Sequence, residues 1–204
     1  MSRPARLLLV VGLALVAAAG GALALLVQHG VSALDEPTAM EAWMARTTRH
    51  LATPRAARAA PNPVAATTEV LSRARAHFAD HCASCHGNDG RGKTAIGRNL
   101  YPKAPDMTLP DTQSLSDGEL FYVIENGVRL TGMPAWGSTG SHDATESWEL
   151  VHYIRHLPKV TAEELAEMED LNPKSRKELE EEEQTRRFLQ GEGEAPAPPP
   201  EHKH

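Results

Sequence analysis

Both cysteines of this 204-residue chain fall in one short run, Cys82-Ala83-Ser84-Cys85-His86. Two cysteines cannot build a disulfide framework, nor a zinc or iron–sulfur site with four thiolates. On a helix, the Cys-x-x-Cys spacing sets two thiols one turn apart, which suits the two vinyl groups on one porphyrin edge, and the adjacent imidazole can reach the iron. The motif therefore predicts one covalent haem c, attached through Cys82 and Cys85, with His86 as an iron ligand.

A thioredoxin-like dithiol is the alternative use of a Cys-x-x-Cys motif, and there the motif opens a helix that follows a strand. Here Val70, Ala74 and Phe78 recur every four residues before the cysteines, which predicts an amphipathic helix running into the motif. A glycine-rich stretch, residues 87–92, then ends the helix. This order favours haem over a dithiol.

A haem iron held by one histidine needs a sixth ligand or keeps an open face. Met133 lies in Gly132-Met133-Pro134, on a loop that proline and glycine make rigid, and a thioether there would give His/Met ligation. Met107 is the competing candidate, and core packing is the general alternative for either methionine. We favour Met133 as the second axial ligand.

The rest of this region has helical patterns. Ser116 and Glu119 form a capping box, and Asp143 is a predicted N-cap of a closing helix that carries Trp148. No run alternates at period two long enough to predict a strand. The predicted fold class is all-α, a small helical fold wrapped around one haem and preceded by a single transmembrane helix.

An uncharged run from Leu7 to Val27 follows Arg3 and Arg6. At about 1.5 Å per residue it can span a hydrocarbon core of ~30 Å. A signal peptide cleaved near Ala24 is the alternative, but the apolar run continues beyond that site, which favours an uncleaved anchor. Because the arginines keep the N-terminus in the cytoplasm, we expect a single-pass protein of the cytoplasmic membrane with its haem domain on the exported, periplasmic side.

Four regions are expected. Residues 1–28 are the anchor or signal segment, and 29–68 a Pro/Ala-rich linker, interpreted as a tether with a short helix starting near Thr38. Residues 69–158 are the haem domain, and 159–204 an acidic, partly helical tail that is disordered from Gly191. The net charge of −6 argues against a nucleic-acid partner, because phosphate binding needs a basic face.

The region from 69 to 158 resembles a class I cytochrome c, and is most similar to the short bacterial variety in subunit III of cbb3-type oxidases. The matching features are Phe78 and the motif, the Met133 loop, and the closing helix with Trp148 and Tyr153. The resemblance implies haem c with His86 and Met133 as axial ligands. It also implies packing of the first helix against the last near Phe78 and Trp148.

One stretch departs from this family. Gly97-Arg98-Asn99-Leu100 resembles the family's Gly-Pro-Asn-Leu, whose proline carbonyl accepts a hydrogen bond from the haem-ligand imidazole, and Arg98 stands in the proline's place. The carbonyl of Arg98, or of a nearby proline, is expected to take that role, which tunes the basicity of the ligand.

These features predict a single-electron carrier in a respiratory-type chain, with redox proteins as donor and acceptor, rather than an enzyme in its own right. Two alternatives stay open. One is a haem peroxidase or gas sensor with an open distal site, and the other is a cytochrome subunit of a larger oxidase or dehydrogenase complex.

Overall fold

The computed structural model describes residues 2–30, 32–137 and 143–191, and every regular element in these ranges is helical. This confirms the predicted all-α fold. The predicted disordered end of the tail lies, from residue 192 on, outside the described residues. The elements are α1 (Arg3–His29), α2 (Ala39–Ala52), α3 (Arg55–Ala59), α4 (Thr68–His77), the π-helical turn η1 (Phe78–Cys82), α5 (Ala83–His86), the 3-10 turn η2 (Gly97–Asn99), α6 (Pro110–Gln113), α7 (Asp117–Asn126), α8 (Ala144–His156), the 3-10 turn η3 (Leu157–Lys159), α9 (Ala162–Leu171) and α10 (Arg176–Leu189).

The hydrophobic core lies between α4 and α8, which make the most extensive helix–helix contact in the described part of the chain. The ring of Phe78, directly after α4, lies 5.1 Å from that of Tyr153 on α8. The expected packing of the first helix on the last is therefore present. Trp148 has a different ring partner, because it stacks on Phe121 of α7 with centroids 4.0 Å apart.

Polar side chains fix α7 against α8. The predicted capping box of α7 is confirmed, since Ser116 accepts from the Glu119 N–H and the Glu119 carboxylate accepts from the Ser116 N–H. Arg155 of α8 donates to Asp117 at the start of α7. It also donates to the carbonyl of Gln113, at 2.7 Å, so one guanidinium holds three consecutive segments together.

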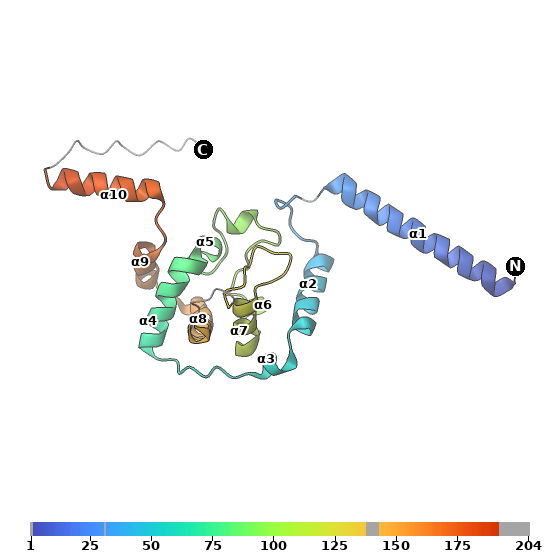
Figure 1. Cartoon of the computed structure of the whole chain (residues 1–204), viewed down its shortest axis with the longest axis horizontal. Coiled ribbons are helices and arrows are strands. Elements are labelled where there is room, and N and C mark those ends of the chain that lie inside the picture. The colour runs from blue at the N-terminus through green and yellow to red at the C-terminus, as the bar shows by residue number, and fades with distance from the viewer. Residues whose placement is uncertain (1, 31, 138–142, 192–204) are drawn as a thin grey trace.

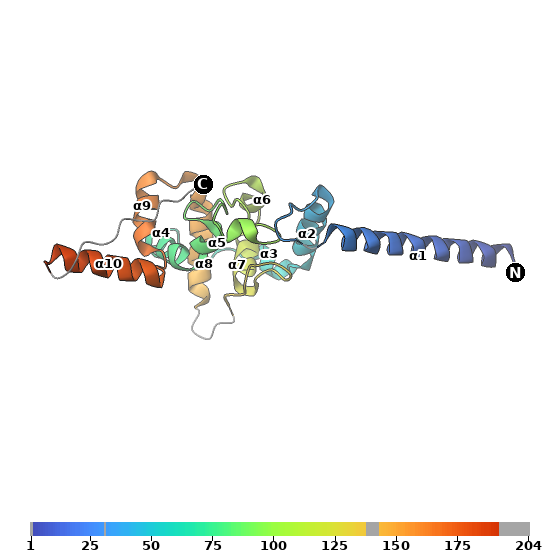
Figure 2. The same cartoon turned by 90° about the horizontal axis from the view of Figure 1, so that it is seen from above.

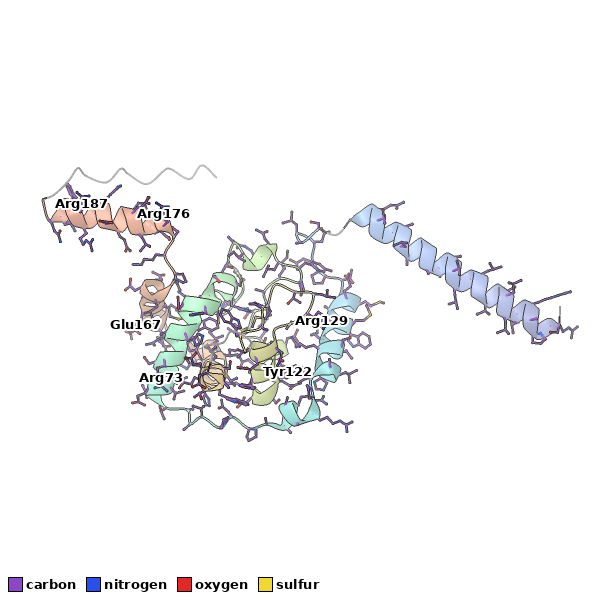
Figure 3. All side chains as sticks on the ribbon, viewed as in Figure 1. Arg73, Tyr122, Arg129, Glu167, Arg176 and Arg187 are labelled. Atoms are coloured by element: carbon purple, nitrogen blue, oxygen red, sulfur yellow. The ribbon has the colours of Figure 1, made fainter. Side chains whose placement is uncertain are left out.

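Helix α9 packs on the core, although it belongs to the region expected to be an acidic tail. Met168 has no exposed surface, and its sulfur accepts a hydrogen bond from the Tyr153 hydroxyl at 2.9 Å. On the same flank, Arg75 of α4 pairs with Glu164 and Glu167, the latter labelled in Figure 3. Helix α10 extends away from the domain, with Arg176 and Arg187 along it. The domain boundaries stay a prediction, but the packed core reaches α9.

The region expected to be a tether runs along two sides of the domain as α2, α3 and the non-helical segment before α4 (Figure 1). Its contacts are with residues far along the chain. The imidazole of His50 lies 2.7 Å from the Glu119 carboxylate, and Asn62 donates to the Trp148 carbonyl at 2.9 Å. The packing was not predicted from the sequence of this region, which is rich in alanine. Alanine lets backbones approach closely. We call residues 33–64 the collar.

Helix α1 is the one helix, among the described residues, that is long and apolar enough to cross a membrane. None of its apolar window is buried inside the structure. Figures 1 and 2 both show α1 leaving the domain on the side of α2, with α10 on the opposite side. The helix is therefore compatible with a single-pass anchor.

Candidate functional site

The Cys-x-x-Cys-His motif lies at the C-terminal end of a continuous helical segment made of α4, η1 and α5. The N–H of Ala83 donates to the carbonyl of Phe78, five residues back, so one extra residue is accommodated in the turn that leads to Cys82. Gly87 then ends the segment with a φ of 74°, a conformation that glycine adopts without strain. The predicted helix into the motif is confirmed, whereas no pattern in the sequence indicated the π turn.

The two thiols are unpaired and half-buried. Burial raises the pKa of the Cys82 thiol to about 12, and the neighbouring Cys85 adds to the rise. A dithiol that exchanges disulfides needs the opposite shift, because the thiolate is the nucleophile. Cys82 also lies near the C-terminal end of this helical segment, where the carbonyls disfavour a negative charge. These features argue against a redox dithiol at this site.

The His86 side chain has a buried Nδ1 atom with no hydrogen-bond partner among the described residues. Burial lowers the pKa of His86, which favours the neutral imidazole, the form that binds metal ions. The backbone around it is fixed, since the His86 carbonyl accepts from the Gly92 N–H at 2.7 Å. A buried ring nitrogen without a partner indicates a group that the described protein atoms alone do not satisfy.

The segment after the motif folds back against it. A β-carbon on Gly97 would lie 2.2 Å from the Cys85 carbonyl oxygen, so only glycine fits there. Thr94 donates to the same carbonyl at 3.1 Å. Arg98 follows Gly97 in the chain, and its carbonyl accepts from the Lys103 ammonium at 2.9 Å. The Arg98 carbonyl is therefore bound to a lysine, and its expected role as acceptor for the His86 imidazole stays a prediction.

The loop that carries Met133 is held by backbone contacts at both ends. Gly127 has a φ of 62°, and a β-carbon there would lie 2.7 Å from the Met133 carbonyl oxygen. That carbonyl accepts from the Val128 N–H at 3.1 Å, and the Met133 N–H donates to Thr131. The loop is thus closed on itself at Met133, which is half-buried.

Two contacts bring this loop to the motif. The Trp136 ring lies 5.4 Å from the ring of His81, the residue before Cys82. A β-carbon on Gly132 would lie 2.7 Å from the Leu100 side chain, at the end of the stretch that packs on Cys85. The structure therefore gathers the motif, the 97–100 stretch and the Met133 loop at one place. His81 and Trp136 were not singled out as a pair, because their contact joins residues distant in sequence.

Comparison with known protein families gives one match. Residues 69–154 match the family described as cytochrome c oxidase, cbb3-type, subunit III. This segment is a cytochrome c domain. No curated protein matches the chain.

The cytochrome c domain implies haem-based electron transfer, and the residues at the site fit a haem c. Two free thiols on one helical turn are followed directly by a neutral imidazole with an unsatisfied buried nitrogen. These are the donors that covalent attachment and axial ligation need. Cys82, Cys85 and His86 are therefore the residues that could hold the group.

The competing methionine has another role in this domain. Met107 is 6% exposed and belongs to the hydrophobic core. Its N–H donates to the Gly90 carbonyl at 2.8 Å, and its own carbonyl accepts from the Gln113 amide at 2.7 Å. Gln113 also donates to the Ile154 carbonyl, which ties this loop to α8. Met107 thus packs between the glycine-rich stretch that follows the motif and helix α8.

Proposed function

We propose that this chain is a membrane-anchored cytochrome c that carries single electrons. One haem c is held by thioether bonds to Cys82 and Cys85, with His86 and Met133 as the axial ligands of the iron. The observation that carries the proposal is the thiol–thiol–imidazole group at the end of the helical segment, inside a cytochrome c domain.

The residues around the motif support a carrier rather than an enzyme. When bound, haem c supplies reversible one-electron chemistry between Fe(III) and Fe(II). The imidazole of His86 offers a lone pair, and the ring contact between Trp136 and His81 supports the Met133 loop as the source of the second ligand. Two protein ligands leave no position for a substrate. Met107 supports this assignment by being committed to the core.

The cellular setting follows from α1. With α1 as a transmembrane anchor and Arg3 and Arg6 on its cytoplasmic side, the domain lies on the exported side of the cytoplasmic membrane. Its partners are then a redox donor and acceptor in a respiratory-type chain. The matched family is described as an oxidase subunit, which favours the further proposal that the chain works within a larger respiratory complex.

The ferric absorption spectrum of the purified chain tests the ligation. A low-spin spectrum with a sulfur-to-iron charge-transfer band is expected, and Met133→Leu should abolish that band and produce high-spin iron. Met107→Leu is the matched control, because it removes a thioether from the core and should leave the spectrum unchanged. A high-spin wild-type spectrum would instead support an open distal site, as in a peroxidase or gas sensor.

Covalent attachment has a separate test. The wild-type chain should keep its haem through a denaturing gel, as judged by haem staining. The double substitution Cys82→Ala/Cys85→Ala should remove all covalently bound haem. Staining that survives the double substitution would contradict the proposed attachment.

A further inference from the structure

Helix α2 carries an apolar face that no part of the described chain covers. Met40, Trp43, Met44 and Leu51 lie within one stripe at helical spacing. Their exposed fractions are 69%, 62%, 47% and 72%. Large apolar side chains gathered on one helix face mark an interaction surface rather than the scattered exposure that is normal for single residues.

A flank of α2 beside the apolar stripe is fixed to the cytochrome domain. Arg46 pairs with Asp111 at 3.1 Å, and His50 lies 2.7 Å from the Glu119 carboxylate. Thr53, just after the helix, is buried. The apolar stripe is therefore held outward, at a set position on the domain, and does not rotate freely on a tether.

The chain before α2 places this stripe close to the end of α1. The chain is anchored here, because the Lys103 ammonium donates to the carbonyls of Ala33 and Leu34, at 3.4 and 3.1 Å. Only residues 30–32 separate these anchored residues from His29, the last residue of α1. That stretch spans at most about 14 Å when fully extended. A membrane crossed by α1 thus begins next to α2.

The direction and chemistry of α2 fit the surface of that membrane. In both views of the chain, α2 runs steeply across the direction of α1, so a membrane crossed by α1 has α2 lying along its plane (Figures 1 and 2). Tryptophan is enriched at the headgroup level of membranes.

We propose that the Met40–Trp43–Met44–Leu51 face of α2 inserts into the outer surface of the lipid bilayer beside α1. This inference rests on the anchoring role of α1 in the proposed function. The collar then acts as a strap that joins the membrane surface to the domain. Because α2 is bound to α7 through Glu119, the strap fixes which side of the domain faces the bilayer.

Lipid contact can be measured on the full chain in nanodiscs that hold one chain each, with and without brominated lipids. The chain has three tryptophans, and the other two, Trp136 and Trp148, lie in the domain. Bromine quenches tryptophan only on contact. We expect a bromine-dependent loss of fluorescence in the wild type, and we expect Trp43→Phe to remove it.

Thiol accessibility gives a second readout that does not depend on fluorescence. Met44→Cys lies on the stripe and Ala45→Cys on an exposed flank of the same helix. In nanodiscs, a membrane-impermeant maleimide should react about tenfold more slowly at position 44 than at position 45, after subtraction of the wild-type reaction. Similar rates at the two positions would overturn the proposal.

Flotation with vesicles separates this inference from the anchor on which it rests. A chain that fails to float would overturn both the anchor and the strap. A chain that floats without bromine-dependent loss, or whose loss survives Trp43→Phe, would overturn the strap alone. Protection of position 44 without bromine contact would show that protein covers the stripe, which also overturns lipid docking.

Discussion

Leu130 lies in the loop that carries Met133, and it combines two unusual properties. Its φ is 63°, the one positive value among the non-glycine residues that the structure describes. Its side chain is 91% exposed, so no packing repays the strained backbone. For a residue other than glycine or asparagine, the left-handed conformation costs roughly 1–2 kcal/mol.

The strain at Leu130 predicts a stabilising substitution. Leu130→Asn should raise the free energy of unfolding by about 0.5–1 kcal/mol, because asparagine tolerates this conformation. Urea denaturation followed by circular dichroism measures the change. Leu130→Ala is the control, since it keeps the β-carbon that causes the strain and should not stabilise the chain. Equal gains in both variants would contradict strain as the cause.

At the scale of elements, α9 decides where the folded unit ends. Met168 is fully buried against Tyr153, and a buried hydrogen bond joins them. Helix α10 follows it, with its apolar residues Leu179 and Leu189 exposed. The two helices of the acidic tail therefore differ, because the first completes the core and the second does not touch it.

This difference predicts the outcome of truncation. A chain ending at residue 173 should keep its free energy of unfolding within about 0.5 kcal/mol of the full length. Met168→Ala in the full chain should lower it by about 2–5 kcal/mol, because a methionine in the core leaves a cavity. Thermal or urea unfolding compares the two. A larger loss on truncation than on Met168→Ala would show that α10 contributes to the fold.

The acidic side chain of Glu164, which forms the capping box of α9 with Thr161, predicts a pH dependence. Burial acts to raise the pKa of Glu164, but hydrogen bonds from the Thr161 N–H and His156 outweigh it and hold the pKa below its ordinary value of 4.5. A carboxylate with a lowered pKa in the folded state stabilises the fold above pH ~4.5, and that contribution is lost as the pH falls through the folded-state pKa.

Acid titration of unfolding tests this sign. We expect Glu164→Gln to lose stability at neutral pH and to show a weaker decline below pH ~4.5 than the wild type. Glu163→Gln, at an exposed position on the same turn, is the control and should follow the wild-type curve. A wild-type-like acid decline in Glu164→Gln would contradict the assignment.

Local features of the site and fold were predictable, because each depends on residues near one another in sequence. The Ser116–Glu119 capping box needs only four residues, and the Cys82–His86 motif needs five. The collar was not predictable, since Asn62 bonds to a carbonyl 86 residues later. The π turn before Cys82 was missed for another reason, which is that an extra residue in a helical turn leaves no distinct side-chain pattern.

At the scale of the whole molecule, glycine sets how closely the collar approaches the domain. A β-carbon on Gly118, in the first turn of α7, would lie 1.8 Å from the carbonyl oxygen of Ala57 on α3. The adjacent Ser116 hydroxyl donates to the Arg58 carbonyl at 2.8 Å. Since both contacts involve backbone atoms of α3, the collar cannot shift without breaking them.

Gly118→Ala should therefore detach the collar. We expect the free energy of unfolding to fall by about 1–3 kcal/mol, from overpacking, and limited proteolysis between residues 39 and 67 to become faster. Gly21→Ala is the control, because nothing lies within 4 Å of its added β-carbon. Unchanged proteolysis in Gly118→Ala would show that the collar does not depend on this approach.

The collar also has a consequence for the order in which the chain matures. Its partners come later in the chain, since His50 bonds to a residue 69 positions on and His152 to Val64 across 88 positions. A chain delivered from its N-terminus exposes α2 and then the cysteines before those partners have emerged. Under the proposed covalent attachment, we expect the motif to be reachable during delivery, because the collar can close only after residues 119 and 152 have emerged.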